Sequence, residues 1–76
     1  NPKSDLQEYA SREGLGTPRY QLIDKTGPDH VPIITVEVSL DNGLRLSAKA
    51  GSKKKAEIEA ARGLLEKLLT GIVETS

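Results

Sequence analysis

Residues 34–48 carry the pattern that most restricts what this chain can fold into. Hydrophobic side chains occupy every second position of the first half, at Ile34, Val36, Val38 and Leu40. Polar side chains fill the positions between them, at Thr35, Glu37 and Ser39. This alternation is typical of a strand with one buried side and one solvent-facing side. The turn sequence Asp41-Asn42-Gly43 follows, so we expect residues 44–48 to return as the second strand of a hairpin.

A further strand is predicted before the hairpin. Thr17-Pro18 begins an extended stretch, and the residues after it alternate in character. Tyr20 and Leu22 alternate there with Gln21 and Ile23. The turn-rich sequence Gly-Pro-Asp-His at residues 27–30 separates this stretch from the hairpin. Together these patterns predict three strands joined as a meander.

Helical patterns flank the strands on both sides. Asn1 is suited to cap a helix that begins with Pro2 and ends before a glycine pair. The apolar positions of this first helix are Leu6, Tyr9 and Ala10. A longer helix is predicted after Ser52, its expected N-cap, and Gly71 marks its end. Its apolar stripe consists of Ala56, Ala60, Leu64, Leu65 and Leu68.

The order helix, three strands, helix predicts an α+β domain. A sheet with one apolar face needs cover on that face alone, so both helices should pack on one face of a three-stranded antiparallel sheet. A chain of 76 residues has room for one small domain. We expect this single domain to span residues 1–76, with a core of about residues 2–70.

The chain offers few groups for metal, redox or catalytic chemistry. It has no cysteine and a single histidine, His30, which excludes disulfides, thiolate zinc sites and histidine clusters. Its carboxylates are scattered along the sequence, whereas a metal-dependent hydrolase needs several that converge on one site. We therefore expect a non-catalytic chain with no metal site and no cofactor.

The sequence shows neither a membrane span nor a targeting segment. No apolar run approaches the ~20 residues that a membrane helix needs, and the first residues lack a signal-peptide pattern. The absence of cysteine favours a reducing compartment. We therefore expect a cytoplasmic protein.

Positive charge is concentrated in one segment. The formal net charge is zero, yet Lys49, Lys53, Lys54 and Lys55 fall within seven residues, and the rest of the chain sums to −4. Three of these lysines open the last helix after Ser52, where the helix dipole favours acidic residues instead. Free backbone N–H groups and lysines together favour an anion, most naturally a phosphate. The alternative is that these lysines are ordinary solvated residues.

A second candidate site lies on the first helix. Ser4, Gln7, Glu8 and Ser11 fall at positions i, i+3, i+4 and i+7 and form a polar stripe opposite the apolar side chains. Their hydroxyl, amide and carboxylate groups are suited to hydrogen bonds with ribose 2′-hydroxyl groups. The alternative is a helix face that is merely solvated.

The turn-rich loop between the first two strands presents His30. We expect this side chain to be exposed, because the loop consists of glycine, proline and polar residues. It is either an ordinary turn residue or a group that reaches into a shallow groove of a partner.

Three motifs together resemble the double-stranded RNA-binding domain. LQEY lies on the first helix, GPDH lies between the first two strands, and SKKKAE opens the last helix. The resemblance covers nearly the whole chain, from about Pro2 to Leu69. PKSDLQEY, GPDHVPIITVEV and KKKAEIEAA are most similar to the domain that ends bacterial-type ribonuclease III. The resemblance implies the same order of elements and binding of double-stranded RNA with little sequence specificity.

The resemblance also assigns contacts with RNA. The positions that match Ser4, Gln7, Glu8 and Ser11 contact one minor groove. The position that matches His30 enters the next minor groove. Lys53 and Lys54 match lysines that bind phosphates across the intervening major groove, with Ser52 and Lys55 nearby. Glu57 is a departure, because many relatives carry a further lysine there.

The resemblance leaves the parent protein open. In a ribonuclease III, an endonuclease of RNA processing that can form a homodimer, the magnesium ligands belong to a separate catalytic domain. Some relatives use the same fold to dimerise, but these typically lack the lysine pair that this chain has. A dicer-like or other non-catalytic RNA-binding protein is a third candidate parent. We expect the isolated domain to be a monomer that binds double-stranded RNA.

Overall fold

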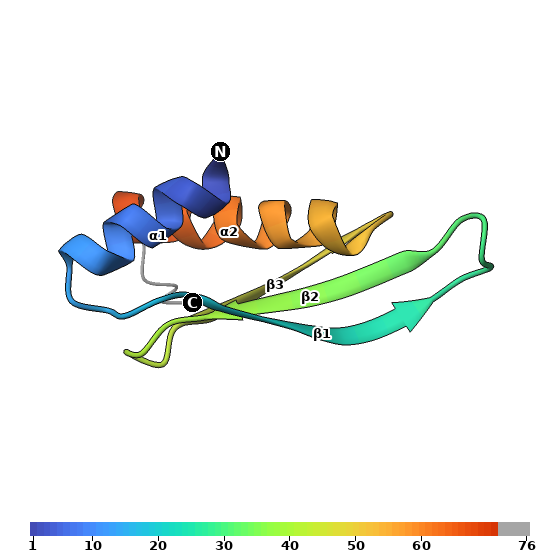
Figure 1. Cartoon of the computed structure of the whole chain (residues 1–76), viewed down its shortest axis with the longest axis horizontal. Coiled ribbons are helices and arrows are strands. Elements are labelled where there is room, and N and C mark those ends of the chain that lie inside the picture. The colour runs from blue at the N-terminus through green and yellow to red at the C-terminus, as the bar shows by residue number, and fades with distance from the viewer. Residues whose placement is uncertain (72–76) are drawn as a thin grey trace.

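The computed structural model describes residues 1–71, and residues 72–76 of the predicted domain lie outside the described residues. The elements follow the predicted order. They are α1 (Pro2–Arg12), β1 (Arg19–Thr26), β2 (Ile33–Ser39), β3 (Arg45–Ala50) and α2 (Lys53–Thr70). Both helices lie on the same side of the sheet, with α1 packed against α2 (Figure 1). The predicted α+β architecture is therefore confirmed.

The sheet is an antiparallel meander with the strand order β1-β2-β3. Val38 of the central strand pairs with Tyr20 on one side and with Leu46 on the other. β3 begins one residue later and ends two residues later than the predicted strand at residues 44–48. Lys49 and Ala50 extend it, because Thr35 and Ile34 of β2 supply them with partners.

The hydrophobic core lies between the helices and the inner face of β2. The largest side chains that are fully buried are Leu6, Leu64, Val36 and Val38. Alanines fill the positions where α2 approaches the sheet and α1, namely Ala56, Ala60 and Ala61. The predicted stripe is confirmed for Ala56, Ala60 and Leu64, while Leu65 and Leu68 are half-buried at its edge. Ala61 was not predicted as core.

The predicted alternation along β1 is wrong beyond Tyr20. Leu22 pairs with Val36 but remains 43% exposed, and a bulge between Leu22 and Asp24 interrupts the register. β1 is an edge strand, whereas α2 packs mainly on β2 and β3, so the helices leave Leu22 partly uncovered. Thr35 differs from the prediction in the opposite way, since it is less exposed than expected. It lies on the polar face but is buried, because strands flank it on both sides.

The ends of both helices are capped as the sequence predicts. The Asn1 side chain accepts a hydrogen bond from the backbone N–H of Lys3 at 2.8 Å. The Ser52 hydroxyl oxygen accepts one from the backbone N–H of Lys55 at 3.1 Å. Gly71 ends α2 in the left-handed conformation, with φ of 64°. Each cap satisfies a terminal backbone group that the helix itself leaves unpaired.

Gly63 allows α2 to lie close to β3, which yields a first prediction. A Cβ atom at this position would lie 3.0 Å from Cδ2 of Leu46. Gly63→Val should therefore reduce the free energy of unfolding by about 1–3 kcal/mol, because its methyl groups overpack this contact. Urea unfolding measures the change.

Gly63→Ala is the control for this prediction. Its gain of about 1 kcal/mol in helix propensity opposes the close contact, so we expect a much smaller net change. A valine variant as stable as the unaltered domain would show that β3 does not restrict α2 at this position.

Candidate nucleic-acid interface

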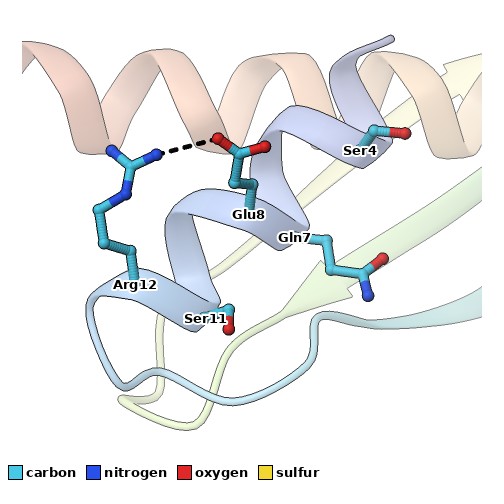
Figure 2. A pocket seen from close by; sticks show the side chains of 5 residues that line it. All are labelled: Ser4, Gln7, Glu8, Ser11 and Arg12. Carbon is cyan, nitrogen blue, oxygen red and sulfur yellow. Dashed lines mark hydrogen bonds and ion pairs between the residues drawn. The ribbon is translucent and has the colours of Figure 1, made fainter.

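The four predicted polar residues of α1 form one exposed surface, here called the α1 stripe. Ser4, Gln7, Glu8 and Ser11 are all exposed and line a shallow depression (Figure 2). They face solvent because Leu6 and Ala10, on the opposite side of α1, are fully buried against α2 and the sheet. The structure thus brings together the four residues that the helical spacing grouped. Their contact with RNA stays a prediction.

Arg12 is a fifth residue of this depression that the sequence reasoning missed. Its Nη2 lies 3.0 Å from Oε1 of Glu8, one helical turn earlier, and both side chains are exposed (Figure 2). The i, i+4 spacing of Glu8 and Arg12 was the signal that could have found it. The guanidinium places a positive charge beside acceptor groups, so the depression offers both hydrogen-bond acceptors and a cation.

The second predicted group, Ser52 with Lys53, Lys54 and Lys55, opens α2. The three lysine side chains are exposed, and within residues 1–71 none of their ammonium groups has an acidic partner. Ser52 itself is half-buried and acts as the N-cap. Its hydroxyl oxygen serves the backbone N–H of Lys55, which leaves the first two N–H groups of α2 unpaired in the described part of the chain. These N–H groups and the lysines present a concentrated positive field.

Packing fixes the direction of this end of α2. Ala56, in its first turns, is fully buried against Ile34 and Val36 of β2. Ala56 is small enough to let the helix backbone approach the strand closely. The lysines therefore extend from a helix start that is anchored to the centre of the sheet.

His30 stands apart from both groups. It is exposed, as predicted, in the loop between β1 and β2, which projects past the end of the sheet (Figure 1). A hydrogen bond of 3.0 Å from the N–H of Val31 to the carbonyl oxygen of Pro28 closes the turn around it. The domain extends 39 Å along its longest axis, and the three predicted groups lie on separate elements along it. They form an extended surface and not a single pocket.

A cluster that joins α1, β1 and α2 was not predicted. Lys3 Nζ lies 2.7 Å from Oε1 of Glu57 and 4.8 Å from the centre of the Tyr20 ring. The carboxylate is the better buried partner, since the side chain of Glu57 is only 16% exposed. Glu57, which stands where the resemblance gives many relatives a lysine, therefore has an internal partner. Lys3 and Glu57 are 54 residues apart in the sequence, so no local pattern could have predicted this pair.

The surroundings of Tyr20 in this cluster change the pKa of its hydroxyl group. Its hydroxyl is buried and has no hydrogen-bond partner among residues 1–71. Burial, and to a smaller extent the negative charge of Glu57, raise the pKa of Tyr20 above its ordinary value of 10.0.

Two features are absent from the part of the chain that the structure describes. No three acidic, histidine or cysteine side chains gather where they could hold a metal ion. No described helix combines the length and apolar character needed to cross a membrane. The structure thus offers an exposed polar and basic surface as the candidate site.

The fold and this surface define a small nucleic-acid-binding module, and comparison with known proteins identifies its family. Residues 2–68 match the family described as "Double-stranded RNA binding motif". The chain belongs to this family. The match is to a binding motif, which confirms the interpretation of the chain as a non-catalytic domain.

The curated relatives are full-length enzymes, of which this chain matches one part. The chain is 52% identical over 66 residues to "Ribonuclease 3" of Cereibacter sphaeroides, which covers 87% of this chain and 29% of that protein. It is 46% identical over 71 residues to "Ribonuclease 3" of Rhodobacter capsulatus, covering 93% of this chain and 31% of that protein. The chain therefore spans less than a third of the length of these relatives.

Solved structures of other proteins share the fold. A structure of Arabidopsis HYL1 superimposes with a TM-score of 0.77 and 37% identity, covering 90% of this chain and 96% of that one. The second double-stranded RNA-binding domain of DRB4 gives a TM-score of 0.71 and 33% identity, covering 93% and 99%. These similarities confirm the helix–three strands–helix domain and its assignment to the family.

The Tyr20 cluster gives a second prediction. Because its pKa is raised, the folded state holds the Tyr20 proton more tightly than the unfolded chain does. The stability that this provides is complete below pH 10.0 and is lost as the pH rises through the folded pKa. Glu57→Gln should move the pKa of Tyr20 part of the way back towards 10.0, since burial, the larger cause, remains.

The measurement is a titration of tyrosinate absorbance in a Tyr9→Phe background, where Tyr20 is the one tyrosine left. An unchanged Tyr20 titration after Glu57→Gln would contradict the effect of this carboxylate on Tyr20.

Proposed function

We propose that this chain is the substrate-binding domain of a ribonuclease III-type endonuclease, and that it holds double-stranded RNA for a catalytic domain elsewhere in the parent protein. The chain is about half identical in sequence to two bacterial relatives named "Ribonuclease 3", which supports a ribonuclease III as the parent protein. The magnesium ion and the cleavage chemistry belong to that other domain in this proposal. RNA processing in the cytoplasm, and a homodimeric parent, belong to the same proposal.

The observation that carries the binding function is the pairing of two surfaces on this fold. The α1 stripe offers hydroxyl, amide and carboxylate groups, and the start of α2 offers lysines that have no acidic partner within residues 1–71. In A-form RNA the minor groove is wide and shallow and displays 2′-hydroxyl groups. The α1 stripe is suited to that groove, and the lysines are suited to the phosphates beside it.

His30 completes the proposed contact. Its loop projects beyond the sheet, at the opposite end from α1, which supports a contact with a second minor groove (Figure 1). Contacts to two successive minor grooves and the phosphates between them read the shape of the duplex. Shape reading has little dependence on base sequence, because the donor and acceptor pattern of a minor groove is degenerate.

Preference for RNA over DNA tests this function. Against a duplex of about 20 base pairs, longer than the ~16 base pairs that such domains span, we expect RNA to bind at least about tenfold more tightly than DNA. Losing even two ribose contacts of about 1 kcal/mol each produces that difference. Fluorescence anisotropy with matched duplexes measures it.

Equal affinity for both duplexes would overturn the shape-reading account. The competing function, dimerisation through the same fold, is tested on the same samples by sedimentation. We expect a monomer without RNA, and a stable dimer that RNA does not shift would favour the competing function.

The lysines of α2 give a second test. Replacing Lys53 and Lys54 together by alanine should weaken RNA binding at least about tenfold and reduce the salt dependence of binding by about two phosphate contacts. The melting temperature should stay the same or rise slightly, because two positive charges no longer oppose the helix dipole.

Lys67→Ala is the matched control on the same helix. Lys67 lies in the last turn, where a positive charge is favourable, so its loss should cost about 0.3–1 kcal/mol of stability and leave RNA binding unchanged. If the double variant instead melts at a lower temperature yet binds RNA normally, Lys53 and Lys54 are structural residues and the phosphate assignment is wrong.

A further inference from the structure

Glu57 lies where an acidic side chain should neutralise the basic end of α2. It follows Lys53 by four residues and Lys54 by three, so all three side chains emerge on neighbouring parts of the helix surface. Lysine and glutamate at these spacings form ion pairs on helices. In the structure Glu57 pairs with neither lysine. Its carboxylate accepts a hydrogen bond of 2.7 Å from Lys3, which is 54 residues away along the chain.

The contacts of Lys3 explain why it holds Glu57. Its backbone N–H is fixed by the Asn1 cap at 2.8 Å, which sets the first turn of α1. Its ammonium lies 4.8 Å from the centre of the Tyr20 ring, at a distance typical of a cation–π contact. The side chains of Lys3 and Glu57 are 37% and 16% exposed, so solvent screens this pair less than it would screen an exposed pair. A pairing of Glu57 with Lys53 or Lys54 would lie at the exposed surface and would be weaker.

We propose that Lys3 is a positioning residue for RNA binding, because it holds the Glu57 carboxylate in an ion pair and so keeps Lys53 and Lys54 free for phosphates. This inference rests on the proposed function. It assigns to Lys3 an effect through Glu57 and no contact with RNA. It also explains how a chain with an acidic residue at this position keeps a basic surface there.

A double-variant cycle tests the inference in the folded domain. Lys3→Gln releases the Glu57 carboxylate, which then pairs with the lysines of α2. RNA affinity should fall about tenfold at low salt, and the slope of log K against log salt should fall by about one phosphate contact. Adding Glu57→Gln to this variant removes the released carboxylate. Affinity and slope should then return to those of the Glu57→Gln variant alone.

Two comparisons distinguish the release of Glu57 from a general loss of positive charge and from a loss of structure. Arg62→Gln removes a positive charge from an exposed pair with Glu59, at 3.1 Å on the same helix, and should leave both affinity and slope unchanged. Melting temperatures identify loss of structure, which the double variant would not repair. If Arg62→Gln weakens binding as much as Lys3→Gln does, general loss of charge is the cause and the inference is wrong.

Absence of rescue is the decisive negative result. If the double variant binds as weakly as Lys3→Gln, Lys3 acts by touching RNA or by supporting the fold, and the positioning role is overturned while the proposed function stands. If the unaltered domain fails to bind double-stranded RNA, the proposed function is wrong, and the role of Lys3 falls with it.

Discussion

The packing of Ala56 against Ile34 and Val36 is the contact on which the basic end of α2 depends. It seats the start of α2 on the middle strand of the sheet, and Gly63 lets the same helix stay close to β3 further along. α1 then packs on α2 through Leu6 and Ala10. The exposed groups of both helices are therefore positioned by a single set of small and branched apolar residues. Removing methyl groups from such a contact changes geometry as well as stability, because protein interiors are closely packed.

The sequence was sufficient to predict the order of the elements and the helix caps, because these depend on local signals. The alternation from Ile34 to Leu40 predicted a buried face that the structure confirms. Leu22 was predicted less well, since its exposure depends on which strands the helices cover and not on its neighbours in sequence. The bulge after Leu22 likewise arises from pairing with β2, which a single strand pattern does not reveal.

In the candidate site, too, the features that depend on local sequence were predicted and those that depend on tertiary contacts were not. The α1 stripe follows from helical spacing, and the lysines of α2 follow from a rule about helix dipoles, so both were found without a structure. The pair between Lys3 and Glu57 joins the first helix to the last, and no periodicity connects them. Glu57 therefore had no predicted partner, although the tertiary fold gives it one. Net charge was equally uninformative, since a chain of zero net charge still carries a locally basic surface.

The loop that carries His30 is easier to displace than the two helices. It extends beyond the cover of α1 and α2 (Figure 1), and every residue from Gln21 to Val31 is exposed. Few buried contacts oppose its bending, so its displacement costs little free energy compared with a movement of either helix. The proposed RNA contacts would thus comprise two on rigid helices and one on a compliant loop. With RNA bound as proposed, such an arrangement would tolerate duplexes whose groove spacing departs from regular A-form geometry, because the loop would adjust while the core stays unchanged.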